Sequence, residues 1–445
     1  MSVYSGGRKN FHTEHTDPAE QQVLKMRIVF RRRRLAAVFL LGVLLVSACS
    51  EDGRVVVPDA DAQTILAGAV NVPKVYRDKL EGVYTVTDGN VIFGPQVVLK
   101  WTGTTLSLFW ERSAGVAFFA TGLRDSSLLC AGSWRTLTNT ETGVVTLQCG
   151  PADGIGAVLR SDSLTDGSLV LQGTFSTPDG PQKRPLRLVY KRPLYAGPRP
   201  FHIIAHRAGG RNSDRLPASE NTVELVRLAE FYGSTGVEID VQLTADGVPV
   251  IYHDEYLNLR LNQRSGLVGT VGSYTFAQLE TFVRLINGER IPSLRRMLST
   301  ILHETNLKFV WLDSKPSMPI STLRIAQRLY HDSAAALGRD LRILIGLPDE
   351  DKVNEFLALA DYRQAPALCE LDPDDVRRTN AAVWAPRWTL GTQNAEVEAL
   401  QAEGRRAFVW TLDVSGYIRQ FVRDGRFDGI LTNYPSLVAY HYYAQ

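Results

Sequence analysis

The stretch Val237-Glu238-Ile239-Asp240-Val241 decides how the second half of this chain folds and what its site contains. Glu238 and Asp240 interrupt an apolar run and stand two residues apart, so on a β-strand both side chains project to the same side. Two carboxylates on one face repel each other unless a cation lies between them or one is protonated. Oxygen ligands of this kind suit Mg²⁺ or Ca²⁺ better than Zn²⁺. The stretch therefore predicts a strand that carries a divalent metal site.

Three other apolar runs also end in charged or titratable residues. Taken singly, each of these residues would be interpreted as a hydrogen-bonded histidine or a surface ion pair. Charged residues are rare in strands unless they are paired or functional, so their occurrence at the ends of four strands favours a common site. Together these residues could bind a metal and move protons. The run His202–Ala205 is followed by His206 and Arg207. The run Val248–Tyr252 is followed by His253 and Asp254, and Lys308–Leu312 by Asp313 and Lys315.

Strands and helices alternate from Phe201 to the end, which predicts an α/β fold. About 240 residues with eight or nine strands is the size of one TIM (β/α)₈ barrel, in which catalytic groups lie at the carboxyl ends of the strands. Nine candidate strands leave one surplus, and Ala367–Leu371 and Ala382–Trp384 are the weakest. A doubly wound open sheet is the alternative, but no glycine-rich dinucleotide loop follows the first strand. We expect Ser219 or Asn221 to cap the first helix.

Residues 201–438 resemble the glycerophosphodiester phosphodiesterase family, whose fold is a TIM barrel. The resemblance rests on eight short stretches in the same order and with similar spacing, over about half the chain. The stretches are Ala205–Gly209, Ser219–Thr222, Val237–Gly247, Val250–Asp254, Ile291–Leu294, Leu312–Lys315, Val409–Leu412 and Asp428–Pro435.

The resemblance implies a role for each matching residue. It makes Glu238, Asp240 and Asp313 the metal ligands, with Asp313 where the family usually has Glu. It makes His206 and His253 the acid–base pair, and Arg207 and Lys315 the cations that face the phosphate. Glu220 becomes a further ligand or orients Arg207, and Trp410 packs against the glycerol moiety. Departures from the pattern are Asp313, Arg295-Arg296 after Ile-Pro-x-Leu, and Asn433 in place of a frequent Asp.

The activity implied by the resemblance is metal-dependent hydrolysis of glycerophosphodiesters to glycerol 3-phosphate and an alcohol. Whether water or a hydroxyl of the substrate attacks stays open. A phospholipid or lysophospholipid headgroup phosphodiesterase on the same barrel is one alternative. A non-catalytic envelope-binding lipoprotein is another, against which the presence of both His206 and His253 argues.

Residues 74–194 have a different pattern, with short alternating runs broken by Gly, Asp, Asn and Thr. This spacing predicts a small antiparallel β-sandwich or β-barrel as an accessory domain. The segment contains no histidine, and its aromatic residues are interpreted as core. Cys130 and Cys149 lie in neighbouring candidate strands, and whether they form a disulfide stays open. The proline-rich residues 195–200 are interpreted as a stiff linker.

The first 48 residues are interpreted as a secretory signal. Arg31-Arg32-Arg33-Arg34 precedes the apolar run Leu35–Val46 and the small residues Ser47-Ala48. The run is shorter than the roughly 20 residues that span a bilayer. The stretch before Cys49 resembles a bacterial lipoprotein processing box, which implies a lipid on Cys49, a tether over residues 49–73, and anchoring to the bacterial cell envelope after export. An ordinary secretory signal or an anchor helix is the alternative, and Met26 could be the true start.

The charge of the chain excludes one class of partner. The 49 Lys and Arg residues and 47 Asp and Glu residues give a net charge of +2. Residues 1–48 alone hold eight of the basic and three of the acidic residues, so the remainder is slightly acidic. No basic surface suited to nucleic acid is expected. The expected partners are a small phosphodiester and, through the anchor, a membrane.

Overall fold

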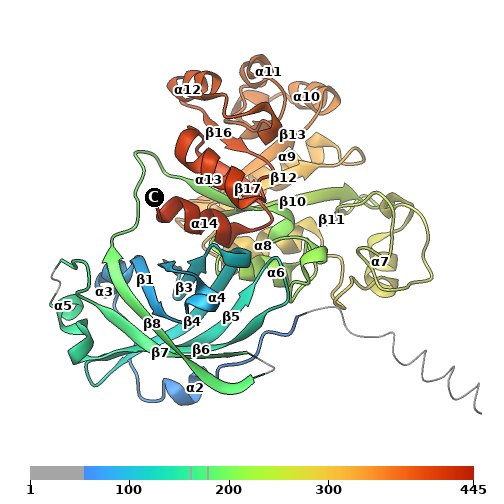
Figure 1. Cartoon of the computed structure of the whole chain (residues 1–445). Helices are drawn as coiled ribbons and strands as arrows, with labels where there is room; N and C mark the ends of the chain where they lie inside the picture. Colours follow the sequence, from blue (N-terminus) through green and yellow to red (C-terminus); the bar gives the residue numbers. More distant parts are fainter. Residues whose placement is uncertain (1–54, 161–162, 178–179) are drawn as a thin grey trace, which may run out of the picture. The chain divides into compact units, whose positions relative to one another are not determined.

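The computed structural model describes residues 55–160, 163–177 and 180–445. These residues belong to one unit that contains two β-barrels (Figure 1). The predicted signal, Cys49 and the start of the tether lie outside the described residues. Among the described residues, no helix is both long and apolar enough to cross a membrane.

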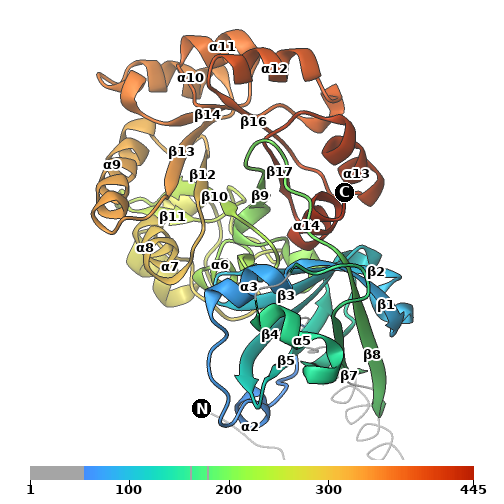
Figure 2. The same cartoon turned by 90° about the vertical axis from the view of Figure 1, so that its left-hand side faces the viewer.

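The first folded part is a closed antiparallel barrel, which decides between the two predicted β architectures. Each strand pairs with the next in the chain, and β8 returns to pair with β1 (Figure 2). Its strands are β1 Gly82–Asp88, β2 Gln96–Thr102, β3 Thr105–Trp110, β4 Gly115–Arg124, β5 Ser127–Thr136, β6 Thr142–Cys149, β7 Val170–Thr177 and β8 Gly180–Arg192. The helices before and between them are α2 Ala62–Ile65, α3 Lys74–Leu80, α4 Asn90–Phe93 and α5 Ile155–Leu159.

Aromatic side chains fill the interior of this barrel. Phe93 packs against Trp110, Trp134 and Phe175 with ring centroids 4.8, 6.0 and 5.1 Å away. Such offset and edge-to-face pairs stabilise a core beyond the area they bury. The interpretation of these aromatic residues as core agrees with this packing.

The two cysteines of the barrel are free and buried. Cys130 stands opposite Leu147, and Cys149 stands opposite Leu128, so the cysteines are diagonal rather than direct neighbours. Diagonal pairs on an antiparallel sheet are roughly 7–8 Å apart, beyond the usual reach of a disulfide. Burial, followed by the charge of Asp153, raises the pKa of the Cys149 thiol to about 12.

The second part is the predicted TIM barrel. Eight parallel strands close when β17 pairs with β9 and β9 with β10. These strands are β9 His202–Ala205, β10 Gly236–Leu243, β12 Phe309–Ser314, β13 Arg342–Leu347, β14 Ala367–Cys369, β15 Val383–Trp384, β16 Arg406–Val409 and β17 Gly429–Thr432. The helices are α6 Val223–Ala229, α7 Phe276–Phe282, α8 Leu294–Glu304, α9 Ile320–Ala336, α10 Glu350–Leu357, α11 Pro373–Arg378, α12 Asn394–Ala402, α13 Ser415–Asp424 and α14 Pro435–Tyr443.

The candidate strand that does not belong to the barrel is β11 Pro249–Ile251. The expectation that one of the two weakest candidates would be surplus was wrong. Those two became β14 and β15 of the barrel. Strand β11 instead pairs antiparallel with β10, with Val241 opposite Ile251. Strand β10 is long enough to continue past its barrel neighbours and form this hairpin. The chain that follows β11 therefore returns toward the carboxyl end of the barrel.

The two barrels share one hydrophobic core cluster. Phe109 of β3 and Val116 of β4 belong to the same cluster as Tyr232 and Ala439 of the TIM barrel. The Ser107 hydroxyl donates to the carbonyl oxygen of Phe231 at 3.1 Å. Burial of apolar surface therefore joins the two parts.

Candidate active site

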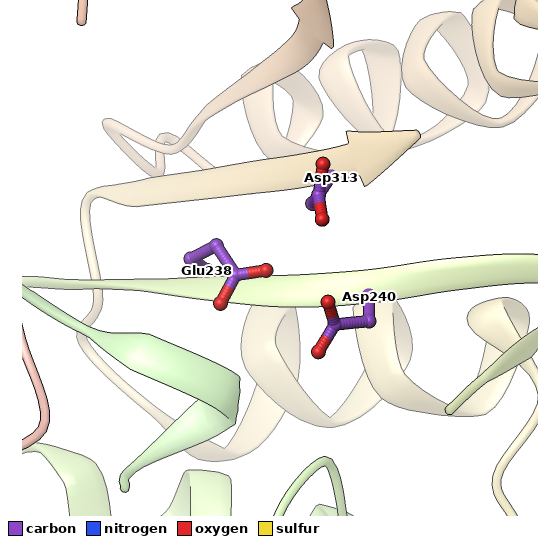
Figure 3. Close-up of side chains that lie close together, drawn as sticks. All are labelled: Glu238, Asp240 and Asp313. Atoms are coloured by element: carbon purple, nitrogen blue, oxygen red, sulfur yellow. The ribbon is translucent and has the colours of Figure 1, made fainter. Parts of the chain in front are cut away.

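Three carboxylates converge at the carboxyl end of the barrel. Glu238 and Asp240 lie on β10, and Asp313 lies opposite Asp240 on β12. One oxygen atom from each carboxylate lies within 4.8 Å of one from each of the others (Figure 3). Alternation along β10 and the parallel register with β12 bring the three together.

The cluster holds more negative charge than its own cation balances. Lys315 Nζ lies 2.6 Å from Asp240 Oδ1 and 2.5 Å from Asp313 Oδ2. Burial, followed by the charges of Asp240 and Asp313, raises the pKa of Glu238 well above its ordinary value. One ammonium group faces three carboxylates, and a divalent cation would restore the balance. The donor set, all oxygen, fits Mg²⁺ or Ca²⁺.

His206 follows β9, and a polar side chain lies beside each of its two ring nitrogens. Its Nδ1 donates to Asn433 Oδ1 at 2.9 Å, and its Nε2 lies 3.8 Å from Glu238 Oε2. Burial, followed by the charge of Arg207, lowers the pKa of His206 to about 4. Because Nδ1 carries the hydrogen, Nε2 presents a lone pair.

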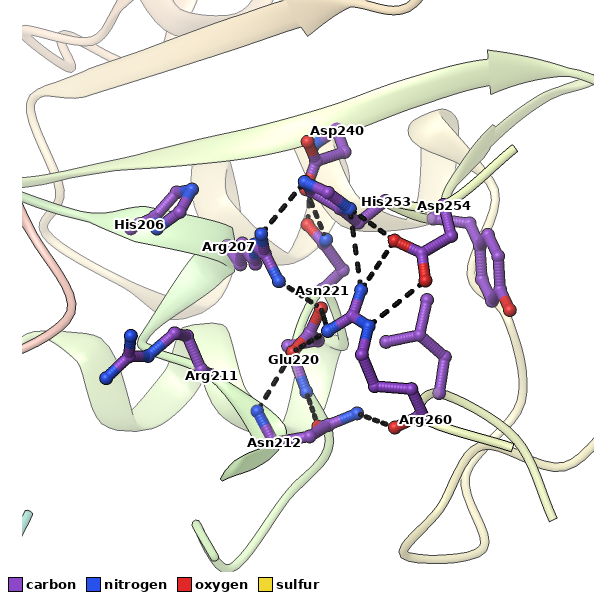
Figure 4. Close-up of polar contacts among 12 residues, drawn as sticks. His206, Arg207, Arg211, Asn212, Glu220, Asn221, Asp240, His253, Asp254 and Arg260 are labelled. Atoms are coloured by element: carbon purple, nitrogen blue, oxygen red, sulfur yellow. Dashed lines mark hydrogen bonds and ion pairs between the residues drawn. The ribbon is translucent and has the colours of Figure 1, made fainter. Parts of the chain in front are cut away.

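Arg207 connects the carboxylate cluster to the second histidine. Its backbone N–H donates to Glu238 Oε2 at 2.8 Å, from a left-handed conformation with φ of 52°. Its Nη2 donates to His253 Nε2 at 2.9 Å, and its Nη1 to Glu220 Oε1 at 2.8 Å (Figure 4). Of the two roles expected for Glu220, this geometry agrees with orienting Arg207, since Glu220 lies outside the carboxylate cluster.

His253 reaches the site through the β10–β11 hairpin. Its Nδ1 donates to Asp254 Oδ1 at 2.6 Å. Arg260 Nη2 donates to the same oxygen at 2.6 Å, and Arg260 Nη1 donates to Glu220 Oε1 at 3.1 Å. Burial alone would raise the pKa of Asp254, but hydrogen bonds from Arg260 and His253 hold it well below its usual value. His253 is thus fixed with its hydrogen on Nδ1.

Trp410 lies at the rim where β16 ends, with different neighbours from the other predicted residues. Its indole Nε1 donates to the carbonyl oxygen of Ala385 at 2.7 Å. The guanidinium of Arg387 stands 4.9 Å from its ring centroid. The structure thus gathers all predicted site residues at the carboxyl end of the barrel except Cys49, which lies outside the described residues.

Several site residues were missed in the sequence. Glu370 follows β14, and burial, followed by the charge of Asp313, raises its pKa to about 8. The rule that polar residues follow strands could have found it. Asn221 Nδ2 donates to Asp240 Oδ2 at 2.6 Å, yet it lies in a loop. For Asn221 and Arg260, which lie away from strand ends, the strand-end pattern gives no signal.

Residues 206–437 match the sequence profile of the Glycerophosphoryl diester phosphodiesterase family, which is about half of the chain. The chain belongs to this family. The matched range begins at the first histidine of the site and ends inside α14. The family domain therefore contains the whole site, whereas the antiparallel barrel lies outside the match.

Individual family members are similar over parts of the chain. Glycerophosphodiester phosphodiesterase 1 of Homo sapiens is 30% identical over 148 residues, which are 32% of this chain and 40% of that protein. Glycerophosphodiester phosphodiesterase of Caldanaerobacter subterraneus subsp. tengcongensis is 23% identical over 246 residues, which are 52% of this chain and 94% of that protein. The chain thus spans less than half the length of the human relative.

Solved structures of the family also align with about half of this chain. A glycerophosphodiester phosphodiesterase from Parabacteroides distasonis aligns with a TM-score of 0.43 and 24% identity, over 54% of this chain and 96% of that one. An Oleispira antarctica phosphodiesterase in complex with sn-glycerol-3-phosphate aligns with a TM-score of 0.42 and 21% identity, over 53% of this chain and 94% of that one.

Proposed function

We propose that this chain hydrolyses glycerophosphodiesters to glycerol 3-phosphate and an alcohol. The observation that carries the proposal is the placement of two oriented histidines beside a buried carboxylate cluster. His206 lies 3.8 Å from Glu238, and His253 is bonded to Arg207, whose backbone N–H also binds Glu238. Family membership supports the same reaction class.

The proposed cofactor is Ca²⁺ or Mg²⁺, held by Glu238, Asp240 and Asp313. When bound, it would polarise the phosphate oxygens and offset their charge. Lys315, between Asp240 and Asp313, and Arg207 supply further positive charge for the same oxygens.

The histidines divide the proton transfers between them. His206 Nε2 has a free lone pair and takes the proton of the attacking hydroxyl group. His253, protonated on Nε2, gives that proton to the leaving alcohol. Asp254 accepts the Nδ1 hydrogen of His253 at 2.6 Å and fixes the orientation of the ring. Once a phosphate binds, Arg207 has an anion to pair with in place of His253 Nε2.

Release of glycerol 3-phosphate from glycerophosphocholine tests the proposal directly. We expect chelator treatment, His206→Ala and Glu238→Gln each to lower the rate by about 10²-fold or more, because a general base contributes about 10²–10⁴-fold and the other two changes remove or weaken the metal site. The exposed His303 on α8 provides a matched control, and His303→Ala should turn over like the native chain. Native turnover by metal-free protein would reject the mechanism. Adding Ca²⁺ or Mg²⁺ separately to that protein identifies the effective ion.

We also infer that the chain is exported and anchored to the bacterial envelope by a lipid on Cys49. The support is the basic run Arg31-Arg32-Arg33-Arg34, the apolar run Leu35–Val46 and the small residues before Cys49. Labelled palmitate should be incorporated by the native chain and not by Cys49→Ala. Equal labelling of the two would reject the lipid anchor.

A further inference from the structure

The end of the TIM barrel opposite the carboxylate cluster holds a cavity of about 350 Å³. Phe309, Arg342 and Arg406 line it, and each is the first residue of its strand, β12, β13 and β16. Parallel strands begin at one end of a barrel and end at the other, so this cavity is separate from the active site. Leu344 and Val383 contribute apolar walls.

The cavity is lined by three arginines and by no acidic residue. The arginines are Arg342, Arg363 and Arg406. In the part of the chain that the structure describes, none of the three has a carboxylate within ion-pair distance, and the guanidinium of Arg363 stands 5.3 Å from the Tyr362 ring centroid instead.

Other arginines of the same barrel are paired. Arg377 Nε lies 2.8 Å from Glu403 Oε1, and Arg405 Nε lies 3.2 Å from Glu403 Oε2. Arg324 Nη2 lies 2.8 Å from Asp361 Oδ2. The positive charge of the cavity is therefore a local feature and not a general excess of arginine.

Arg406 shows that this charge is poorly balanced. Its guanidinium contacts His202 Nε2 and stands 5.3 Å from the centroid of the Phe309 ring. Burial, followed by the charge of Arg342, lowers the pKa of Arg406, and the carboxylates of Asp428 and Asp340 offset only part of this. Asp428 is itself bonded to Arg199 Nε at 2.8 Å. Arg406 is half-buried and lies within reach of the like charge of Arg342, so an anion beside the two would relieve their repulsion.

We propose that this cavity binds a small organic phosphate monoester. A dianion matches a group of three cations better than a monocarboxylate does, and guanidinium groups bind phosphate oxygens in pairs. The volume of about 350 Å³ leaves room for a short carbon skeleton against Leu344 and Val383. It falls within the range of about 300–1,000 Å³ that is common for small-molecule pockets.

Calorimetric titration of the full chain with sn-glycerol 3-phosphate, in the presence of a chelator, tests the proposal. The native chain should bind, and the double variant Arg342→Gln/Arg363→Gln should bind at least about tenfold more weakly, since it removes two of the three cations that would pair with the dianion. A matched control is Arg290→Gln/Arg328→Gln, which removes the same charge from side chains that are 58% and 66% exposed outside the cavity. This control should bind like the native chain.

Three further outcomes would overturn the proposal. If the double variant binds with native affinity, the cavity is not the binding site. If Arg207→Gln loses binding, the phosphate binds at the active site and not in the cavity. Inorganic phosphate bound as tightly as sn-glycerol 3-phosphate would exclude a site for an organic monoester. If the double variant fails to fold, Arg363→Gln alone applies the same criterion, because Arg363 is exposed.

Discussion

His206 owes its orientation to a chain of two residues that follow different strands. Asp413 follows β16, and its Oδ2 accepts from Asn433 Nδ2 at 2.6 Å. Asn433 follows β17, so its remaining Oδ1 faces His206 Nδ1. An amide oxygen can only accept, which places the imidazole hydrogen on Nδ1 and leaves Nε2 free. Asn433, a departure from the family pattern, thus remains compatible with His206 as a base.

Replacing Asn433 by leucine should lower kcat about fivefold with little change in KM, because losing one hydrogen bond costs about 1 kcal/mol and no substrate contact is removed. The ¹⁵N shifts of His206 should show a mixture of tautomers in Asn433→Leu. Asn433→Asp keeps an acceptor for His206 and should keep most of the activity. A native kcat in Asn433→Leu would contradict the orienting role.

His202 makes a specific prediction about stability and pH. Burial, followed by the charges of Arg406 and Lys308, lowers its pKa from 6.5 to about 3 in the folded chain. Above pH 6.5 it is neutral in both states. As the pH falls from 6.5 toward about 3, only the unfolded chain takes up the proton, so the free energy of unfolding decreases.

Urea unfolding between pH 4 and pH 7 measures this contribution. His202→Phe keeps the ring contacts with Phe309 and Phe408. We expect this variant to reduce the slope of the free energy of unfolding against pH by up to about 1.4 kcal/mol per pH unit, compared with the native chain. His303→Ala should leave the slope unchanged. Equal slopes in the native chain and His202→Phe would show that folding does not lower the pKa of His202.

Strand β11 is the element that was predicted wrongly, because it runs antiparallel to β10 and lies outside the parallel barrel. The candidate strands Gly236–Val241 and Val248–Tyr252 are separated by only six residues. A parallel connection needs a dozen or more residues, whereas an antiparallel hairpin needs few. The short separation was therefore a usable signal for the hairpin that carries His253 back to the site.

Helix α6 begins at a different residue from the one expected. Thr222 is its N-cap, and its Oγ1 accepts from Leu225 N at 3.1 Å. Asn221 is instead bonded to Asp240, and Ser219 Oγ donates to Glu289 Oε2 at 2.6 Å. The tertiary contacts of Ser219 and Asn221 thus leave capping to Thr222.

Thr222→Ala should lower the free energy of unfolding by about 1 kcal/mol, the usual cost of losing a side-chain cap. Chemical denaturation measures this change. Thr222→Ser keeps the hydroxyl group and should be close to the native chain. An unchanged stability in Thr222→Ala would contradict the capping role of Thr222.

For the whole molecule, the antiparallel barrel contacts a loop of the active site. Arg135 of β5 is fully buried, and its Nη2 lies 3.5 Å from the carbonyl oxygens of Asp214 and Arg215. The same loop contains Asn212, whose backbone N–H donates to Glu220 Oε2 at 2.9 Å. Glu220 in turn accepts a hydrogen bond from Arg207, so the accessory barrel supports the position of Arg207 indirectly.

Arg135→Met tests this support. Arg135 Nη1 has no hydrogen-bond partner in the structure, and a buried cation without a carboxylate is costly to desolvate. We therefore expect the free energy of unfolding to change by less than about 1 kcal/mol, since apolar replacements of buried charges are often neutral. Activity should fall, and amide exchange of residues 209–219 should accelerate. Unchanged exchange with native activity would show that the contact carries no support.

Local patterns in the sequence were enough to predict the TIM barrel and most residues of the candidate site. Glu238, Asp240, His206 and Asp313 were found because strand periodicity and strand-end chemistry are local properties of the chain. The choice between sandwich and barrel in the first part came from the folded structure. The hydrogen bond between Asn433 and His206 is also visible there and not in the sequence. These features depend on contacts between residues as far apart as 227 positions, which no local pattern encodes.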